Sequence, residues 1–171
     1  MRDKGARNGS RDLPNPRVTI ETGSPADLPH LSSLEQQGMA NPWSSGALAQ
    51  QLENPGSVLL VAIHAQTRKP IGYIAIRRVA DEAEILRLTV EPHFRGRGIG
   101  SQLLATTLCR LRENATATCF LEVRADNSPA LALYRKFSFR ILYRRPSYYT
   151  DGCAALVLAT DLEGLPPTDL S

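Results

Sequence analysis

The sequence has few of the residues that build metal sites or disulfide frameworks. Its 171 residues include three cysteines, Cys109, Cys119 and Cys153, which are odd in number and far apart, and three scattered histidines. That spacing argues against a Cys/His metal site and against a set of disulfides, so we expect no metal. Each cysteine lies in an apolar pattern and is expected to be a small buried residue.

Long apolar runs are also missing. The longest, Val58 to Ile63, is far shorter than the roughly 20 residues of a membrane-spanning helix. The N-terminus is basic but lacks the apolar stretch of a secretory signal. We therefore expect a cytoplasmic protein without a membrane partner.

Lysine is scarce, because only three of the 20 basic residues are Lys and the other 17 are Arg. The planar guanidinium suits recognition of phosphate and carboxylate groups, although a compositional habit of the source genome explains the bias equally well. Aromatic residues make up only 6% of the chain, and no nucleic-acid-binding motif is present. A nucleic-acid module is therefore the weakest of the readings that we consider, and we expect no nucleic-acid partner.

What remains is the composition of one globular domain, with 42% hydrophobic and 22% charged residues. Residues 1–16 are polar and contain Gly and Pro without periodicity, which predicts a flexible tail. Residues 163–171 contain Pro166-Pro167 and are expected to form a second flexible tail. The predicted domain therefore spans residues 17–162.

Strand-like and helix-like patterns alternate along this domain, which predicts an α/β sandwich with a mixed sheet. The expected strands are 17–22, 57–65, 71–79, 84–90, 118–124, 139–144 and 153–160. The expected helices are 25–37, a helix that Ser44 or Ser45 caps and that ends at Leu52, an apolar stripe from Leu103 to Leu111, and a helix from Asn127 to about Phe137. Within 84–90, simple alternation places Ile85, Arg87 and Thr89 on one face and Glu84, Leu86, Leu88 and Val90 on the other.

A basic, glycine-rich loop, Arg95-Gly96-Arg97-Gly98-Ile99-Gly100, lies between a predicted strand and a predicted helix. Glycines let a ligand approach the backbone closely, and the free N–H groups at a helix start favour an anion such as pyrophosphate. The spacing fits neither the Walker pattern nor the dinucleotide-binding pattern. It is R-x-x-G-x-G, the pyrophosphate signature of GNAT acetyltransferases. A tight turn with solvated arginines is the alternative.

The surrounding motifs resemble one family of GNAT acetyltransferases, the RimI-type ribosomal-protein-alanine N-acetyltransferases. These motifs are Glu84 to Pro92, the glycine-rich loop, Leu121-Glu122-Val123-Arg124-Ala125-Asp126-Asn127 and Ala132-Leu133-Tyr134, in that order. The specific match covers residues 81–150, and Asn41-Pro42-Trp43-Ser44 resembles the first interhelical loop of the family.

The resemblance implies the GNAT fold, a mixed and mostly antiparallel central sheet flanked by helices. It also implies transfer of an acetyl group from acetyl-CoA to a protein or peptide N-terminus, with ribosomal proteins among the candidate acceptors. The residues implied to hold acetyl-CoA are Leu88, Thr89, Val90, Arg95, Gly96, Arg97, Gly98, Ile99, Gly100, Ser101 and Asn127. Those implied to line the acceptor site are Trp43, Arg144, Arg145, Tyr148 and Tyr149.

The resemblance also assigns the chemistry to Glu122 as general base and Tyr134 as general acid. Glu122 lies in an otherwise apolar strand, where burial would raise its pKa toward that of a useful base; an ion pair with Arg124 or another arginine is the alternative. A phenol can protonate a leaving thiolate, although a core aromatic is the alternative for Tyr134. Amine and thioester can then react directly in a ternary complex, with the Val90 amide donating to the oxyanion if the strand frees it.

Three positions depart from the family pattern. Arg87 stands where Asn is usual, Cys153-Ala154 stands where an acidic pair is common, and Ser138 replaces a glycine. If Ser138 is left-handed, it costs about 1 kcal/mol relative to Gly. The alternative functions are a GNAT enzyme for lysine or small amines and an acyl-CoA-binding regulatory domain without catalysis.

Overall fold

The computed structural model describes residues 16–163. Apart from Pro16 and Glu163, both predicted tails lie outside the described residues. The strands are β1 (Val18–Thr22), β2 (Ser57–His64), β3 (Pro70–Val79), β4 (Glu82–Val90), β5 (Thr118–Arg124), β6 (Arg140–Arg145) and β7 (Ala155–Asp161). The helices are α1 (Leu28–Gly38), α2 (Ser45–Glu53), α3 (Ile99–Glu113) and α4 (Ser128–Lys136), with short 3-10 turns η1 (Pro25–Asp27) and η2 (Pro92–Phe94).

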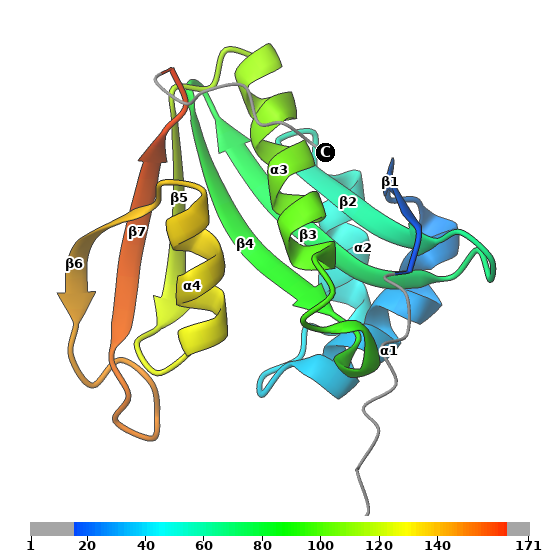
Figure 1. Cartoon of the computed structure of the whole chain (residues 1–171), viewed down its shortest axis with the longest axis horizontal. Coiled ribbons are helices and arrows are strands. Elements are labelled where there is room, and N and C mark those ends of the chain that lie inside the picture. Colours follow the sequence, from blue (N-terminus) through cyan, green and yellow to red (C-terminus); the bar gives the residue numbers. More distant parts are fainter. Residues whose placement is uncertain (1–15, 164–171) are drawn as a thin grey trace, which may run out of the picture.

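The strands form one seven-stranded sheet in the order β1-β2-β3-β4-β5-β7-β6. Only the β4–β5 pair is parallel, so the sheet is mixed and mostly antiparallel, which confirms the predicted fold class. Helices α3 and α4 cover one face, and α1 and α2 cover the other (Figure 1).

The long apolar run in β2 is explained by burial on both faces. Leu60 and Ala62 belong to the core under α3, whereas Leu59, Val61 and Ile63 belong to the core under α1 and α2. A strand that is covered on both sides is apolar throughout instead of alternating. None of the helices within residues 16–163 is long and apolar enough to cross a membrane.

Two predicted helix caps are confirmed. The Ser44 side chain accepts a hydrogen bond from the Ala47 N–H at the start of α2 (3.1 Å), and the Asn127 side chain accepts one from the Ala130 N–H at the start of α4 (3.2 Å). These bonds satisfy amide groups that have no partner inside the helix.

The face assignment within β4 is wrong at Glu84 and Ile85. Ala75 pairs with Arg87 and Ile76 with Ile85, so Leu86 is an extra residue in a β-bulge. The bulge shifts the alternation by one position. Ile85 therefore shares the α3 face with Leu88 and Val90, while Arg87 and Thr89 face α1.

Strands β4 and β5 pair only as far as Ile85 and Leu121. Beyond that point β4 continues along β3 and β5 continues along β7, so the two strands diverge toward their C-terminal ends (Figure 1). The sheet therefore opens between residues 86–90 and 122–124.

The cysteines are only partly as expected. Cys119 is buried, and burial raises the pKa of its thiol to about 12, but Cys109 and Cys153 are half-buried. No cluster of His, Cys, Asp or Glu that could hold a metal is found among the described residues.

Candidate active site

The glycine-rich loop leads directly into α3. Gly96 and Gly98 have φ angles of +73° and +78°, a left-handed backbone that glycine adopts without steric cost. A Cβ atom at either position would meet nothing within 4 Å, so the space above the loop is open. The N-terminus of α3 follows this open loop directly, and the positive end of its helix dipole suits an anion.

The two loop arginines have different surroundings. Arg95 donates from Nε to the Val90 carbonyl (2.9 Å) and from Nη2 to the Gly38 carbonyl (3.3 Å), and so links the end of β4 to the end of α1. The Arg97 guanidinium lies 6.0 Å from the Phe94 ring centre and makes no ion pair with any described residue. Arg97 is therefore the freer of the two cations.

The Val90 amide points into the opening between β4 and β5. Just beyond β4, the Glu91 N–H donates to the Ile71 carbonyl on β3 (2.8 Å), whereas the Val90 carbonyl accepts from Arg95. Backbone groups of one strand residue point to the same side, and successive residues alternate. The Val90 N–H therefore points away from β3, toward the side that β5 has left.

Of the other predicted residues around the opening, Leu88 packs against the core under α3, and the Thr89 hydroxyl is buried without a partner among residues 16–163. Ile99 is buried at the start of α3, and Gly100 lies close to Leu133 of α4. Ser101 follows in the first turn of α3 and is half-buried.

Glu122 lies on the β5 face that α3 and α4 do not cover. Its side chain is 26% exposed, and the Arg145 Nη1 atom lies 3.4 Å from its Oε2. The expected burial is therefore partial, and the ion pair that the sequence left open is present. Arg124 pairs instead with Asp126 and Asp151 (2.8 Å each).

Tyr134 lies on the opposite side of β5 from Glu122, in the core with Leu121 and Val123. Burial is the main cause that raises the pKa of its phenol well above the usual value, so the hydroxyl stays protonated at ordinary pH. The hydroxyl makes no hydrogen bond to any residue from 16 to 163. A protonated, unengaged phenol is what a general acid requires.

The end of α4 fixes the Tyr134 ring. The Phe139 N–H donates to the Tyr134 carbonyl (3.2 Å) and the Ser138 N–H to the Arg135 carbonyl (3.1 Å), which together form a Schellman motif. The Phe139 ring packs against the Tyr134 ring with centroids 5.6 Å apart. Ser138 has a φ angle of +60°, so the left-handed conformation that we considered for it is present.

The predicted acceptor residues fall into two groups. Tyr148 and Tyr149 pack edge to face at 5.2 Å, below the guanidinium groups of Arg145 (5.5 Å from Tyr148) and Arg124 (4.7 Å from Tyr149). Arg144 is exposed and takes part in neither of these arginine–tyrosine contacts. The arginine beside Glu122 is therefore Arg145.

Trp43 alone forms the second group, and it belongs to a buried network that was not predicted from the sequence. The Trp43 backbone N–H donates to Glu35 Oε2 (2.6 Å), and the Tyr73 hydroxyl donates to Glu35 Oε1 (2.6 Å). Arg87 joins the same carboxylate (3.4 Å). A signal was present, because Glu35 follows Leu31 and Leu34 at helical spacing and so occupies a core position.

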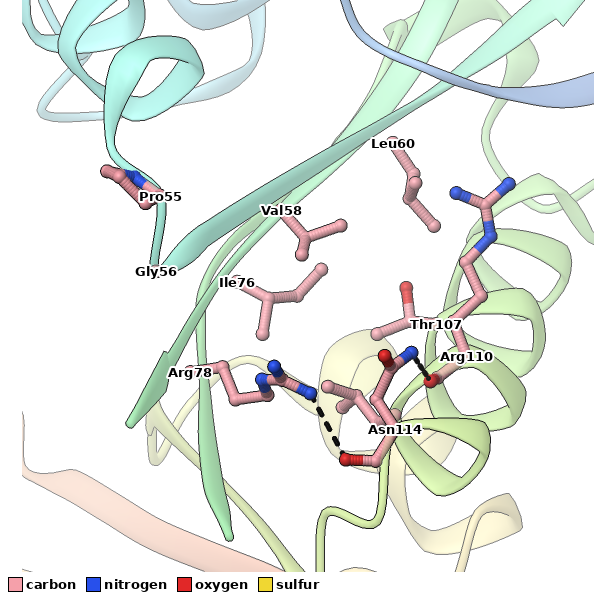
Figure 2. A pocket seen from close by; sticks show the side chains of 10 residues that line it. Pro55, Gly56, Val58, Leu60, Ile76, Arg78, Thr107, Arg110 and Asn114 are labelled. Carbon is pink, nitrogen blue, oxygen red and sulfur yellow. Dashed lines mark hydrogen bonds between the residues drawn. The ribbon is translucent and has the colours of Figure 1, made fainter. Parts of the chain in front are cut away.

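Two cavities differ in whether predicted site residues line them. A cavity of about 360 Å³ on the open sheet face includes Glu122 and Arg145 in its wall. Another, of about 240 Å³, lies between β2, β3 and the C-terminal half of α3 and contains none of the predicted site residues (Figure 2). There Arg78 on β3 donates to the Asn114 carbonyl after α3 (3.1 Å).

Known proteins share this arrangement. The "Acetyltransferase (GNAT) family" model matches residues 28–139, more than half of the chain. The Escherichia coli [ribosomal protein bS18]-alanine N-acetyltransferase is 35% identical over 136 residues, which cover 78% of this chain and 90% of that protein. An uncharacterized Mycobacterium leprae protein is 36% identical over 79% of this chain, but the match spans only 38% of its own length.

The crystal structure of the ribosomal-protein-S18-alanine N-acetyltransferase from Escherichia coli superposes with a TM-score of 0.80 at 29% identity, covering 91% of this chain and 99% of that one. The sequence family and the fold therefore agree. The chain belongs to the GNAT family of acetyltransferases and, within it, to the ribosomal-protein-alanine N-acetyltransferase family.

Proposed function

We propose that this chain transfers the acetyl group of acetyl-CoA to the α-amine of a protein N-terminus, with a ribosomal protein as the acceptor class, by direct reaction in a ternary complex. The observation that carries the proposal is the opening between β4 and β5. The Val90 amide and the start of α3 lie beside it, Glu122 faces one side of the sheet, and Tyr134 faces the other. The family's name supports the choice of an N-terminal acceptor.

Acetyl-CoA would enter with its pyrophosphate over residues 96–101, held by the α3 amides and Arg97. Asn127, which caps α4, would meet the pantetheine arm. The thioester carbonyl would accept a hydrogen bond from the Val90 N–H, which stabilises negative charge on that oxygen as the amine attacks.

The acceptor amine would approach from the Glu122 side. Its lone pair attacks the thioester carbon, a C–N bond forms, and the C–S bond breaks. Glu122, directly or through a water, takes the proton that the nitrogen loses. Tyr134, from the other side of β5, gives its phenolic proton to the departing thiolate and is reprotonated by solvent between turnovers.

The Arg145–Glu122 pair has a consequence for this order of events. While Arg145 holds the carboxylate, one oxygen is engaged at 3.4 Å. Arg145 also donates to the Tyr143 hydroxyl (3.1 Å) and lies over the Tyr148 ring. A bound acceptor near Tyr148 would displace this guanidinium and free Glu122 to take the proton.

A peptide panel tests the proposal. Peptides with a free N-terminal alanine, the same peptides with a blocked N-terminus and an internal Lys, and small amines are each incubated with acetyl-CoA. We expect mass spectrometry to find acetyl groups on free α-amines. Faster reaction of the blocked Lys peptides or of the small amines would replace the N-terminal assignment with one of the alternatives.

A further inference from the structure

Arg87 connects three parts of the chain. From β4 its Nη2 donates to the Asn41 carbonyl in the loop between α1 and α2 (3.0 Å), and it lies 3.4 Å from Glu35 Oε2 on α1. Its guanidinium also stacks 4.7 Å from the centre of the Trp43 ring in the same loop. Two loop residues and one helix residue are thus held by one side chain.

The Glu35 carboxylate explains why this contact is strong. It is fully buried, whereas the Arg87 side chain keeps 15% of its surface exposed. Glu35 accepts from the Tyr73 hydroxyl and from the Trp43 backbone N–H, both at 2.6 Å. A buried carboxylate needs a cation as well as hydrogen bonds, and Arg87 supplies the charge from the open side of the network.

We propose that Arg87 is a positioning residue for the acceptor, which holds the α1–α2 loop (residues 39–44) as a fixed wall of the acceptor site. The inference rests on the proposed function, because it assigns the wall to the site that Glu122 serves. Arg87 and Thr89 face α1 only because of the bulge at Leu86, and the same bulge sets the direction in which the Val90 amide points.

No other side chain makes these contacts at once. Asn at position 87 is too short to span from β4 to both Glu35 and the Asn41 carbonyl. Lys would restore the charge, but its ammonium is a point donor without a planar face to stack on Trp43. We therefore expect Arg87→Lys to rescue the loop in part and Arg87→Asn to release it.

Trp43 provides a readout that does not depend on activity, because it is the only tryptophan in the chain. Release of the loop should expose its ring, so acrylamide should quench the fluorescence of Arg87→Asn more strongly than that of the wild type. Arg78→Asn is the matched control. Arg78 also extends from a central strand to a backbone carbonyl, that of Asn114, but at the distant cavity shown in Figure 2.

The kinetic measurement separates positioning from general damage. If the released loop is in the competent position about a tenth of the time, the acceptor KM rises about tenfold. We expect this rise in Arg87→Asn, with kcat within about threefold of wild type and an unchanged Kd for acetyl-CoA by calorimetry. Arg78→Asn is expected to lower Tm without raising the acceptor KM.

The acceptor used is whichever member of the peptide panel the wild type acetylates, so failure of the α-amine assignment leaves this test intact. Increased Trp43 quenching together with a raised acceptor KM, both smaller in Arg87→Lys, supports the proposal. Unchanged quenching, a KM no higher than that of Arg78→Asn, or a fall in kcat alone overturns it.

Discussion

Glu122 and Tyr134 lie on opposite sides of β5, as the proposed roles of base and acid require. The base must take a proton from the incoming amine, and the acid must give one to the departing thiolate. Because burial raises the pKa of Tyr134, its proton is retained across the range in which an α-amine titrates. The two residues should therefore respond differently to pH.

Replacing the base tests its role directly. Glu122→Gln should lower kcat at least about tenfold, the lower end of general acid–base effects, with little change in the Kd for acetyl-CoA. The loss should shrink as the pH rises from 6 to 9, because solvent then deprotonates the amine. Steady-state rates over that range give the profile; a loss that is constant with pH would argue against a base.

Tyr134→Phe removes the phenolic proton and keeps the ring that packs on Phe139. Its loss of kcat should stay constant up to pH 9, because the raised pKa keeps the wild-type hydroxyl protonated over the whole range. If Tyr134→Phe and Glu122→Gln both retain the wild-type kcat/KM from pH 6 to 9, the two residues are structural.

The sequence could single out Glu122 and Tyr134 as candidates because the motifs around them are local. It could not show that Glu122 pairs with Arg145 rather than Arg124, since that choice depends on how β5 and β6 lie on either side of β7. Arg144 and Arg145 are neighbours in sequence, and only the pleat of β6 decides which of them faces Glu122.

Among the elements, α4 ends in a conformation that its sequence does not favour. Ser138 has a left-handed backbone, which costs an L-residue about 1–2 kcal/mol, and the flexibility of glycine in the unfolded chain offsets part of any gain. Ser138→Gly should therefore raise the free energy of unfolding by about 1 kcal/mol, measured by urea denaturation. Ser128→Gly, at the start of the same helix, should lower the free energy of unfolding by roughly 0.5 kcal/mol. If both substitutions change that free energy equally, the Ser138 backbone is not strained.

The start of α3 offers a test of the proposed acetyl-CoA site. Gly98→Val would place a branched side chain where we expect the phosphates, so calorimetry should show acetyl-CoA affinity lowered at least about tenfold. Gly152→Val is the control, because Gly152 has a similar φ angle (+81°) and an equally open Cβ position. If folded Gly98→Val binds acetyl-CoA as tightly as Gly152→Val does, the phosphates do not bind at this loop.

Most of the elements were predictable because periodicity and caps are local signals. The β-bulge was not, since no glycine marks Leu86 and the extra residue is visible only against β3. The Glu35 network was missed for a related reason. Its members come from α1, the α1–α2 loop, β3 and β4, which the fold alone brings together.

At the scale of the whole molecule, backbone pairing across the middle of the sheet is limited to the four residue pairs from Glu82–Thr118 to Ile85–Leu121. Acetyl-CoA in the opening beyond them would touch both halves. Hydrogen exchange should therefore slow on binding at the Val90 amide and in the first turn of α3, with little change in β2. Slowing spread evenly over the sheet, or absent at Val90, would contradict this placement.

Because of the bulge at Leu86, the number of residues in β4 matters as much as their identity for the direction in which its side chains point. Side chains along a strand alternate between its two faces, so one extra residue changes which side chains face each helix and which amides face the neighbouring strand. Deleting Leu86 would remove the extra residue and leave Arg87, Thr89 and the Val90 amide facing as they do now, because their pairing with β3 begins after the bulge. If all the residues of β4 instead paired with β3 in the register of Ile85, without a bulge, Arg87 and Thr89 would turn into the apolar core and the Val90 amide would turn back toward β3, although every motif residue were kept.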